Sequence, residues 1–91
     1  MSGYVYRIFS KKGDCCYIGI TTKPKISYRY NQHLYEFKRQ RYYYSSYEVM
    51  QHEDHVLELL EENIPKEQLL IKEKHYIEKF NNCVNYNKKK K

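Results

Sequence analysis

The chain contains a set of side chains that can transfer protons, bind anions or hold cations. Tyr6 ends a Tyr-Val-Tyr triplet and Tyr17 begins a Tyr-Ile-Gly triplet, with ten residues between the two tyrosines. Arg29, His33 and Glu73 follow further along the chain. A phenol and an imidazole can move protons, an arginine can stabilise a developing negative charge, and a carboxylate can bind a divalent cation. Together, side chains of these types could bind an anionic group and transfer a proton at it.

The amino-terminal segment predicts a β-hairpin. Tyr4–Phe9 and Cys16–Ile20 are rich in β-branched and aromatic residues, and a Lys-Gly-Asp sequence between them favours a tight connection. This connection is either a two-residue turn at Lys12-Gly13 or a four-residue loop over Lys11–Asp14. Both alternatives give the same register between the two strands.

The register predicts where the two tyrosines lie. Tyr6 is expected opposite Gly19, and Ile8 opposite Tyr17. Because directly paired residues of a sheet point to the same side, the two tyrosines should share one face. Gly19 carries no side chain, so we expect it to leave room beside Tyr6 for a phosphate or an attacking water. Tyrosine is also common in half-buried strands, and the chain has 12 of them, so position is the stronger signal.

Residues 26–40 predict an amphipathic helix. Arg29 and His33 are four positions apart, which places their side chains on one face within reach of a common ligand. Such a pair is more often simply a solvated helix face. The apolar stripe consists of Ile26, Tyr30, Leu34 and Phe37, and the polar stripe of Arg29, His33, Glu36 and Gln40.

The second half of the chain predicts two further strands and a final helix. Residues 46–51 are expected to form a strand, paired through a turn at Glu53-Asp54 with a strand over residues 55–62, for which a short helix is the alternative. Pro65 suits the first turn of a helix that continues, with a break, to Phe80. These elements predict an α+β fold, with a small central antiparallel β-sheet flanked by helices.

Glu73 falls within the apolar stripe of this last helix. A carboxylate in that position should lie at the edge of the core, accept strong hydrogen bonds or bind a cation, because burying it unpaired is costly. The alternative is a rim glutamate that pairs with Lys72 or Lys74. The stripe consists of Leu69, Leu70, Tyr76, Ile77 and Phe80.

The motifs together resemble the signature of the GIY-YIG endonuclease family. The two tyrosine triplets match its opening pattern, and the family places on its first helix an arginine followed four residues later by histidine or tyrosine, as at Arg29 and His33. The Glu-Lys-His-Tyr-Ile run from Glu73 resembles the family's Glu-x-x-Tyr-Ile type run. Asn-Tyr-Asn, ending at Asn87, resembles its Gly-Tyr-Asn ending, with Asn85 as a rival position. The resemblance covers nearly the whole chain.

The resemblance implies a GIY-YIG nuclease fold and a divalent-metal-dependent endonuclease that hydrolyses DNA, duplex or branched. One Mg2+ or Mn2+ ion would be held by Glu73, and Arg29 would stabilise negative charge. Either tyrosine could assist the attack of water; we favour Tyr17, with Tyr6 beside it and His33 helping proton transfer. A phenol with a pKa of about 10 needs a nearby cation to serve as a base. Asn87 is the expected structural or active-site asparagine, and a separate targeting domain or partner protein is also implied.

The composition is that of one small globular domain. The chain has 91 residues, of which 41% are hydrophobic and 31% charged. Four of its 17 basic residues are the lysines at 88–91, so most of the formal net charge of +6 lies in that segment. We therefore expect a nuclease domain over residues 1–87 and a basic tail over residues 88–91, which adds salt-sensitive attraction to phosphates.

Membrane spans, secretion signals and cysteine frameworks are not predicted. No stretch is long and apolar enough to span a membrane, and a strand begins too early for a secretory signal. An intracellular location, cytoplasmic or nuclear, and no membrane partner are expected. Cys15, Cys16 and Cys83 lack the spacing of a zinc site or disulfide framework, so they are interpreted as small buried residues in a reducing compartment.

One other segment has the residue types of a metal site, a set of basic residues could contact nucleic acid, and two other functions are alternatives to a nuclease. The segment His52–His55 has metal-ligand residue types, but no further ligand at a recognised spacing, which favours a turn. The alternative functions are a catalytically inactive DNA-binding module of the same fold and a small interaction domain without DNA affinity. Salt-dependent DNA binding would exclude the second alternative. The candidate nucleic-acid backbone contacts are Lys23, Lys25, Lys38, Arg39 and Arg41, the last three beside the aromatic run at residues 42–44.

Overall fold

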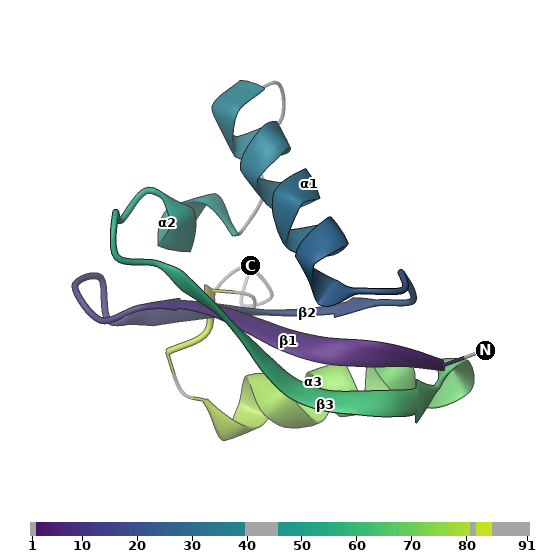
Figure 1. Ribbon diagram of the computed structural model, residues 1–91. Coiled ribbons are helices and arrows are strands. Elements are labelled where there is room, and N and C mark those ends of the chain that lie inside the picture. The colour runs from purple at the N-terminus through teal and green to yellow at the C-terminus, as the bar shows by residue number, and fades with distance from the viewer. Residues whose placement is uncertain (1, 40–45, 81, 85–91) are drawn as a thin grey trace.

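The computed structural model describes residues 2–39, 46–80 and 82–84, and Figure 1 shows their arrangement. In chain order the elements are β1 (Ser2–Ser10), β2 (Cys15–Thr21), α1 (Ile26–Arg39), α2 (Tyr47–Met50), β3 (Val56–Pro65), the 3-10 helix η1 (Lys66–Gln68) and α3 (Leu69–Lys79). The strands form one antiparallel sheet in the order β2-β1-β3. α1 and α2 lie on one face of the sheet and α3 on the other (Figure 1). This architecture confirms the α+β fold expected from the sequence.

β1 and β2 form the expected hairpin. The two strands are joined by a four-residue loop, the second of the two predicted connections, in which Asp14 adopts a φ of 49°. Tyr6 pairs with Gly19 and Ile8 with Tyr17, so the predicted register is confirmed. Both tyrosines therefore face α1, on the side of the sheet that also carries Ile8.

The His52–His55 segment forms a turn that supports the hairpin. Asp54 Oδ1 accepts a hydrogen bond from Ser10 Oγ at 2.6 Å, and Oδ2 accepts from the backbone N–H groups of Lys11 and Lys12 at 3.1 and 3.0 Å. These hydrogen bonds, that from Ser10 foremost, lower the pKa of Asp54. The carboxylate therefore holds the β1–β2 loop against the segment that leads to β3.

The prediction of a strand over residues 46–51 is wrong, because this segment forms the short helix α2. The backbone N–H groups of Val49 and Met50 donate to Ser46 O at 3.1 and 3.0 Å. Tyr47, Val49 and Met50 are all buried. Tyr47 and Val49 fit the period of a strand, but Tyr47 and Met50 fit one helical turn, and the segment is too short for periodicity to decide. Packing against β1 and β2 favours the helix.

The strand expected over residues 55–62 is confirmed as β3, but its partner differs from the prediction. β3 pairs with β1, which makes β1 the central strand. Its register shifts twice, between Gly3 and Val5 and between Val5 and Tyr6. Pro65 ends β3 and precedes η1, so the helical segment begins one residue later than expected. The expected break in this segment is the change from the 3-10 helix η1 to the α-helix α3.

Two hydrophobic clusters lie on opposite faces of the sheet. One contains Val5, Cys16, Ile18, Ile64, Leu69, Ile77 and Cys83, and the other contains Tyr6, Ile8, Val49, Met50 and Val84. Consecutive residues of the central strand thus supply both clusters, since side chains alternate along a strand. Leu70, predicted within the apolar stripe of α3, is 70% exposed, because Leu69 and Ile77 define the buried line of that helix.

Candidate active site

Tyr6, Tyr17 and His33 meet between the hairpin and α1. A hydrogen bond of 2.7 Å joins Tyr6 Oη to His33 Nε2. The Tyr17 ring lies edge-on to the same imidazole, with the two ring centroids 5.4 Å apart. The hairpin register brings the tyrosines to one face, and the helical turn between residues 29 and 33 brings the imidazole to them. Three of the six predicted site residues therefore form one contiguous group.

The space beside Gly19 is occupied, contrary to the expectation that it is free for a phosphate or water. A Cβ atom at Gly19 would lie 2.3 Å from both Cζ and Oη of Tyr6. The phenol of Tyr6 therefore fills the room that the missing side chain leaves. Glycine is needed here because the Tyr6 ring approaches the β2 backbone closely.

His33 is held in its neutral form by its surroundings. The residue is only 6% exposed. Its second ring nitrogen, Nδ1, is 3.2 Å from Ser46 Oγ, and Ser46 is fully buried. Burial, with a smaller contribution from the positive charge of Arg29, lowers the pKa of His33 to about 4. A neutral imidazole has one donor and one acceptor nitrogen, so Tyr6 and Ser46 together determine which nitrogen carries the proton.

Both phenols are also held in their protonated forms. Burial raises the pKa of Tyr6, which is 1% exposed, and it raises the pKa of Tyr17 as well. The Arg29 guanidinium opposes the rise at both tyrosines, whereas the Glu73 carboxylate adds to it. The charges of Arg29 and Glu73 therefore act on the same two phenols.

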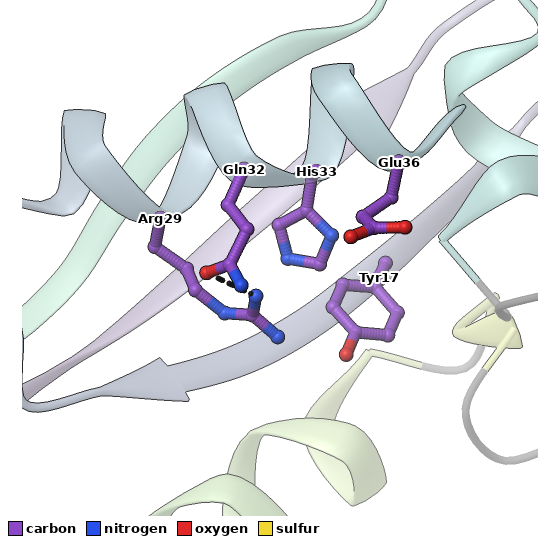
Figure 2. A pocket seen from close by; sticks show the side chains of 5 residues that line it. All are labelled: Tyr17, Arg29, Gln32, His33 and Glu36. Atoms are coloured by element: carbon purple, nitrogen blue, oxygen red, sulfur yellow. Dashed lines mark hydrogen bonds between the residues drawn. The ribbon is translucent and has the colours of Figure 1, made fainter. Parts of the chain in front are cut away.

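A pocket of about 220 Å³ opens between α1 and β2. Figure 2 shows four side chains that extend from α1 towards Tyr17 on β2, with Arg29 near one end and Glu36 near the other. Arg29 Nη1 donates to Gln32 Oε1 at 2.9 Å. Both residues also line a second cavity, of about 460 Å³, together with Lys23 and Leu69. Arg29 therefore lies where the two openings adjoin. The side chains that line the first pocket are Tyr17, Arg29, Gln32, His33 and Glu36.

Glu73 lies on α3, half-buried between Leu69 and Ile77 as its position in the stripe predicts. Lys72, one of the two lysines considered as its partner, forms an ion pair with Glu61 at 3.1 Å. Within the described residues, no group of three or more His, Cys, Asp or Glu side chains could hold a metal ion.

The candidate backbone contacts lie near opposite ends of α1. Lys23 and Lys25 precede this helix, and Lys38 and Arg39 end it; all four are exposed. Arg39 Nη1 donates to Tyr35 Oη at 3.1 Å. A helix of 14 residues is about 21 Å long, so the two groups could not contact one phosphate. The remaining candidates, Arg41 and Asn87, with Asn85 and the residue 88–91 tail, fall outside the described residues.

Sequence reasoning missed two of the polar side chains that orient this site. Ser46 lies 13 positions after His33, and no periodic pattern relates the two. Gln32 is within reach of Arg29 on the same helix, and the three-residue spacing would have been sufficient to find it.

The catalytic-domain model of the GIY-YIG family matches residues 2–89. The chain therefore belongs to the GIY-YIG family. This membership implies nuclease activity on DNA, and nucleases of the family generally depend on a divalent metal ion. No curated protein and no solved structure matches the chain. In the part of the chain that the structure describes, no helix is long and apolar enough to cross a membrane.

Proposed function

We propose that the chain is an active, divalent-metal-dependent endonuclease that hydrolyses DNA phosphodiester bonds in the pocket between α1 and β2. The observation that carries this proposal is the convergence of Tyr17, His33 and Arg29 on one pocket, with Tyr6 hydrogen-bonded behind them. A guanidinium, a neutral imidazole and a phenol around one opening suit an anionic substrate and a water nucleophile.

Arg29 binds the scissile phosphate in this proposal. Its guanidinium can form two parallel hydrogen bonds to phosphate oxygens and stabilises the charge that develops as the bond breaks. Gln32 Oε1 accepts a hydrogen bond from Arg29 Nη1 and so limits the orientations that the guanidinium can adopt. The exposed Lys23, which lines the adjoining cavity, extends the positive surface along the path proposed for the bound DNA strand.

Tyr17 is the residue that orients and activates water. It lines the pocket, whereas Tyr6 is almost completely buried and cannot contact a substrate without rearrangement. Burial keeps the Tyr17 phenol protonated, so the positive charge of Arg29 must be reinforced before this phenol can act as a base. Tyr6 holds the neutral His33 beside Tyr17. The two ring nitrogens of His33 contact the Tyr6 and Ser46 hydroxyls, so a proton would reach the imidazole through one of these hydroxyls.

Glu73 is the proposed ligand of the divalent ion. Mg2+ is usually held by one or two carboxylates together with water and substrate phosphates, which fits a site with a single carboxylate. The effect of the Glu73 charge on both tyrosines supports a position close to the reacting groups. When bound, Mg2+ or Mn2+ would act as a Lewis acid on the phosphate and the leaving oxygen.

The experiment compares wild type with Glu73→Ala and Glu73→Gln on supercoiled plasmid and on branched DNA, with magnesium, with manganese and with chelator. We expect metal-dependent nicking that both variants lose. Glu78→Ala is the matched control, because Glu78 lies on the same helix and is exposed. Full activity of folded Glu73→Ala would reject this metal site. Salt-sensitive DNA binding by wild type without any cleavage would instead identify an inactive binding module.

A further inference from the structure

Two cysteines that are far apart in the sequence lie together on the face of the sheet opposite the pocket. The sulfur atoms of Cys16 and Cys83 are 3.4 Å apart, although the residues are separated by 67 positions. Both side chains are buried, and neither cysteine is in a disulfide. Their backbones form a parallel β-bridge, with Cys16 N–H donating to Asn82 O at 3.2 Å. The backbone therefore positions the two thiols. The prediction of small buried residues is confirmed for Cys16 and Cys83, whereas Cys15 is only half-buried.

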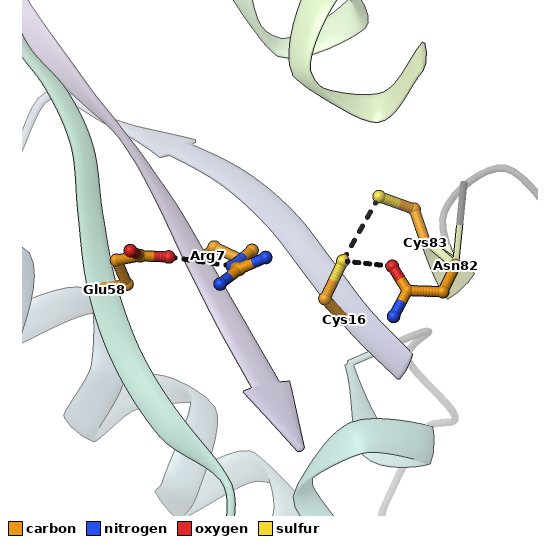
Figure 3. Close-up of polar contacts among 5 residues, drawn as sticks. All are labelled: Arg7, Cys16, Glu58, Asn82 and Cys83. Atoms are coloured by element: carbon orange, nitrogen blue, oxygen red, sulfur yellow. Dashed lines mark hydrogen bonds and ion pairs between the residues drawn. The ribbon is translucent and has the colours of Figure 1, made fainter. Parts of the chain in front are cut away.

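An arginine is fixed beside this pair. The Arg7 guanidinium lies over the rings of Phe9 and Phe80, at 4.2 and 4.4 Å from their centroids. Arg7 Nε also forms an ion pair with Glu58 Oε1 at 2.8 Å. Figure 3 shows Arg7 on the central strand, between Glu58 on one neighbouring strand and Cys16 on the other. A positive charge that is held in this way favours a thiolate on the adjacent cysteines.

The two thiols are not equivalent. The hydrogen bond from Cys16 lowers the pKa of Cys83, and Arg7 lowers it further against the opposing effect of burial. The same hydrogen bond, together with burial, raises the pKa of Cys16. Asn82 Oδ1, 3.4 Å from Cys16 Sγ, is a second acceptor for the single Cys16 proton when that proton is not donated to Cys83 (Figure 3). When Cys16 donates to Cys83, the thiolate therefore forms on Cys83, and Arg7 stabilises it there.

We propose that Cys16 and Cys83 form a redox-active dithiol that a small-molecule disulfide, such as oxidised glutathione, converts into an intramolecular disulfide. Because both thiols are buried, a local opening must first expose them. The Cys83 thiolate then attacks one sulfur of the oxidant, and the oxidant's S–S bond breaks to release one glutathione thiolate, which takes up a proton. Cys16, after losing its proton to solvent, attacks the Cys83 sulfur of the mixed disulfide and releases the second glutathione. Two protein thiols are thereby oxidised, and one glutathione disulfide is reduced to two thiols.

A disulfide fits this pair better than a metal ion does. A structural metal site usually has four protein ligands, whereas among the described residues no group of three or more His, Cys, Asp or Glu side chains could hold a metal ion. Thiol–disulfide exchange, in contrast, needs only the two protein sulfurs, one of them as a nucleophilic thiolate. The bond would tie the Cys83 segment to β2 at the residue before Tyr17, next to the proposed active site. This inference does not depend on the nuclease proposal.

The test equilibrates the full chain in glutathione buffers of graded redox ratio, traps free thiols by acid quenching and alkylation, and measures the intact mass. We expect a transition from three alkylated cysteines to one, without bound glutathione. Cys15→Ser is the matched control, because Cys15 is adjacent in sequence but is not part of the pair; this variant should still lose two free thiols. Cys83→Ser should form no intramolecular bond.

Peptide mapping of oxidised Cys15→Ser identifies the bond even if the Cys83 variant does not fold. A linked pair of tryptic peptides that contain Cys16 and Cys83 would support the proposal. Three free thiols in wild type, or two in Cys15→Ser, at every buffer ratio would overturn it, as would glutathione adducts alone. In wild type, a bond that includes Cys15 would also overturn it. Cleavage of plasmid by the oxidised and reduced forms is a separate measurement, so loss of nuclease activity cannot be mistaken for failure of the thiol chemistry.

Discussion

Gly19→Ala is expected to displace Tyr6 and break its contact with His33. The added Cβ would lie 2.3 Å from Tyr6 Cζ and Oη, whereas ordinary van der Waals contacts begin at 3.4 Å. The ring must therefore move by about 1 Å, because carbon atoms cannot approach closely at low cost. The hydrogen bond between Tyr6 and His33, now 2.7 Å, would then exceed the range of such bonds.

The expected loss of stability can be estimated from these two effects. Overpacking a buried site costs about 1–3 kcal/mol, and a lost hydrogen bond costs about 1 kcal/mol more. For a chain of this size the sum lowers the melting temperature by on the order of 10 °C or more. Thermal unfolding followed by circular dichroism measures this change, and plasmid nicking below the new transition measures activity, which should fall.

Tyr6→Phe and the double variant provide the controls. Tyr6→Phe alone removes the hydrogen bond without crowding the site. In the double variant the ring keeps Cζ against the new methyl group but has no hydroxyl and is not tied to His33, so it can move more easily. The loss of stability of the double variant should therefore be smaller than the sum of the single losses. Gly19→Ala with the wild-type melting temperature and activity would refute the argument that Tyr6 occupies this space. If the stability losses of the two single variants simply add in the double variant, the hydroxyl is not the source of the strain.

Three further outcomes test other parts of the structure. Because burial lowers the pKa of His33 to about 4 from 6.5, the unfolded chain binds an extra proton between these values, and the free energy of unfolding should fall by up to about 3 kcal/mol as the pH drops through this range. Urea unfolding of wild type and His33→Gln across this range measures the effect, and equal pH slopes would contradict it. Ser46→Ala should lower kcat about tenfold and shift the pH profile of cleavage, because it frees the choice of His33 tautomer; Ser46→Thr should restore the profile, and a loss of stability with unchanged kinetics would leave Ser46 only a packing role. A Cys16–Cys83 disulfide closes a loop of 67 positions and should stabilise the oxidised protein by about 4 kcal/mol in thermal unfolding; a lower melting temperature on oxidation would show that the bond strains the fold.

Local patterns were sufficient to predict the elements that carry most of the site. The register of the β1–β2 hairpin follows from the length of one loop, and the position of His33 relative to Arg29 follows from one helical turn. Both depend on residues that are close in sequence. The positions of Tyr6, Tyr17 and His33 could therefore be predicted before their contacts were known.

Features that depend on distant contacts could not be predicted in this way. The segment over residues 46–51 has buried side chains that fit either period, and packing against the sheet selects the helix. The meeting of Cys16 with Cys83 depends on how the segment after α3 returns to β2. The filling of the space beside Gly19 depends on the rotamer of Tyr6, which the strand register does not determine.

The central position of β1 has a consequence for insertions and deletions. Tyr6 on one side of this strand contacts His33, and the next residue, Arg7, lies beside the thiol pair on the other side. A one-residue insertion or deletion in a strand moves every following side chain to the opposite face. Such a change in β1 would place a guanidinium among the tyrosines and a phenol among the cysteines. The length of this one strand is therefore constrained by both sites at once, and a genetic selection for nuclease function should recover substitutions in β1 but no change in its length.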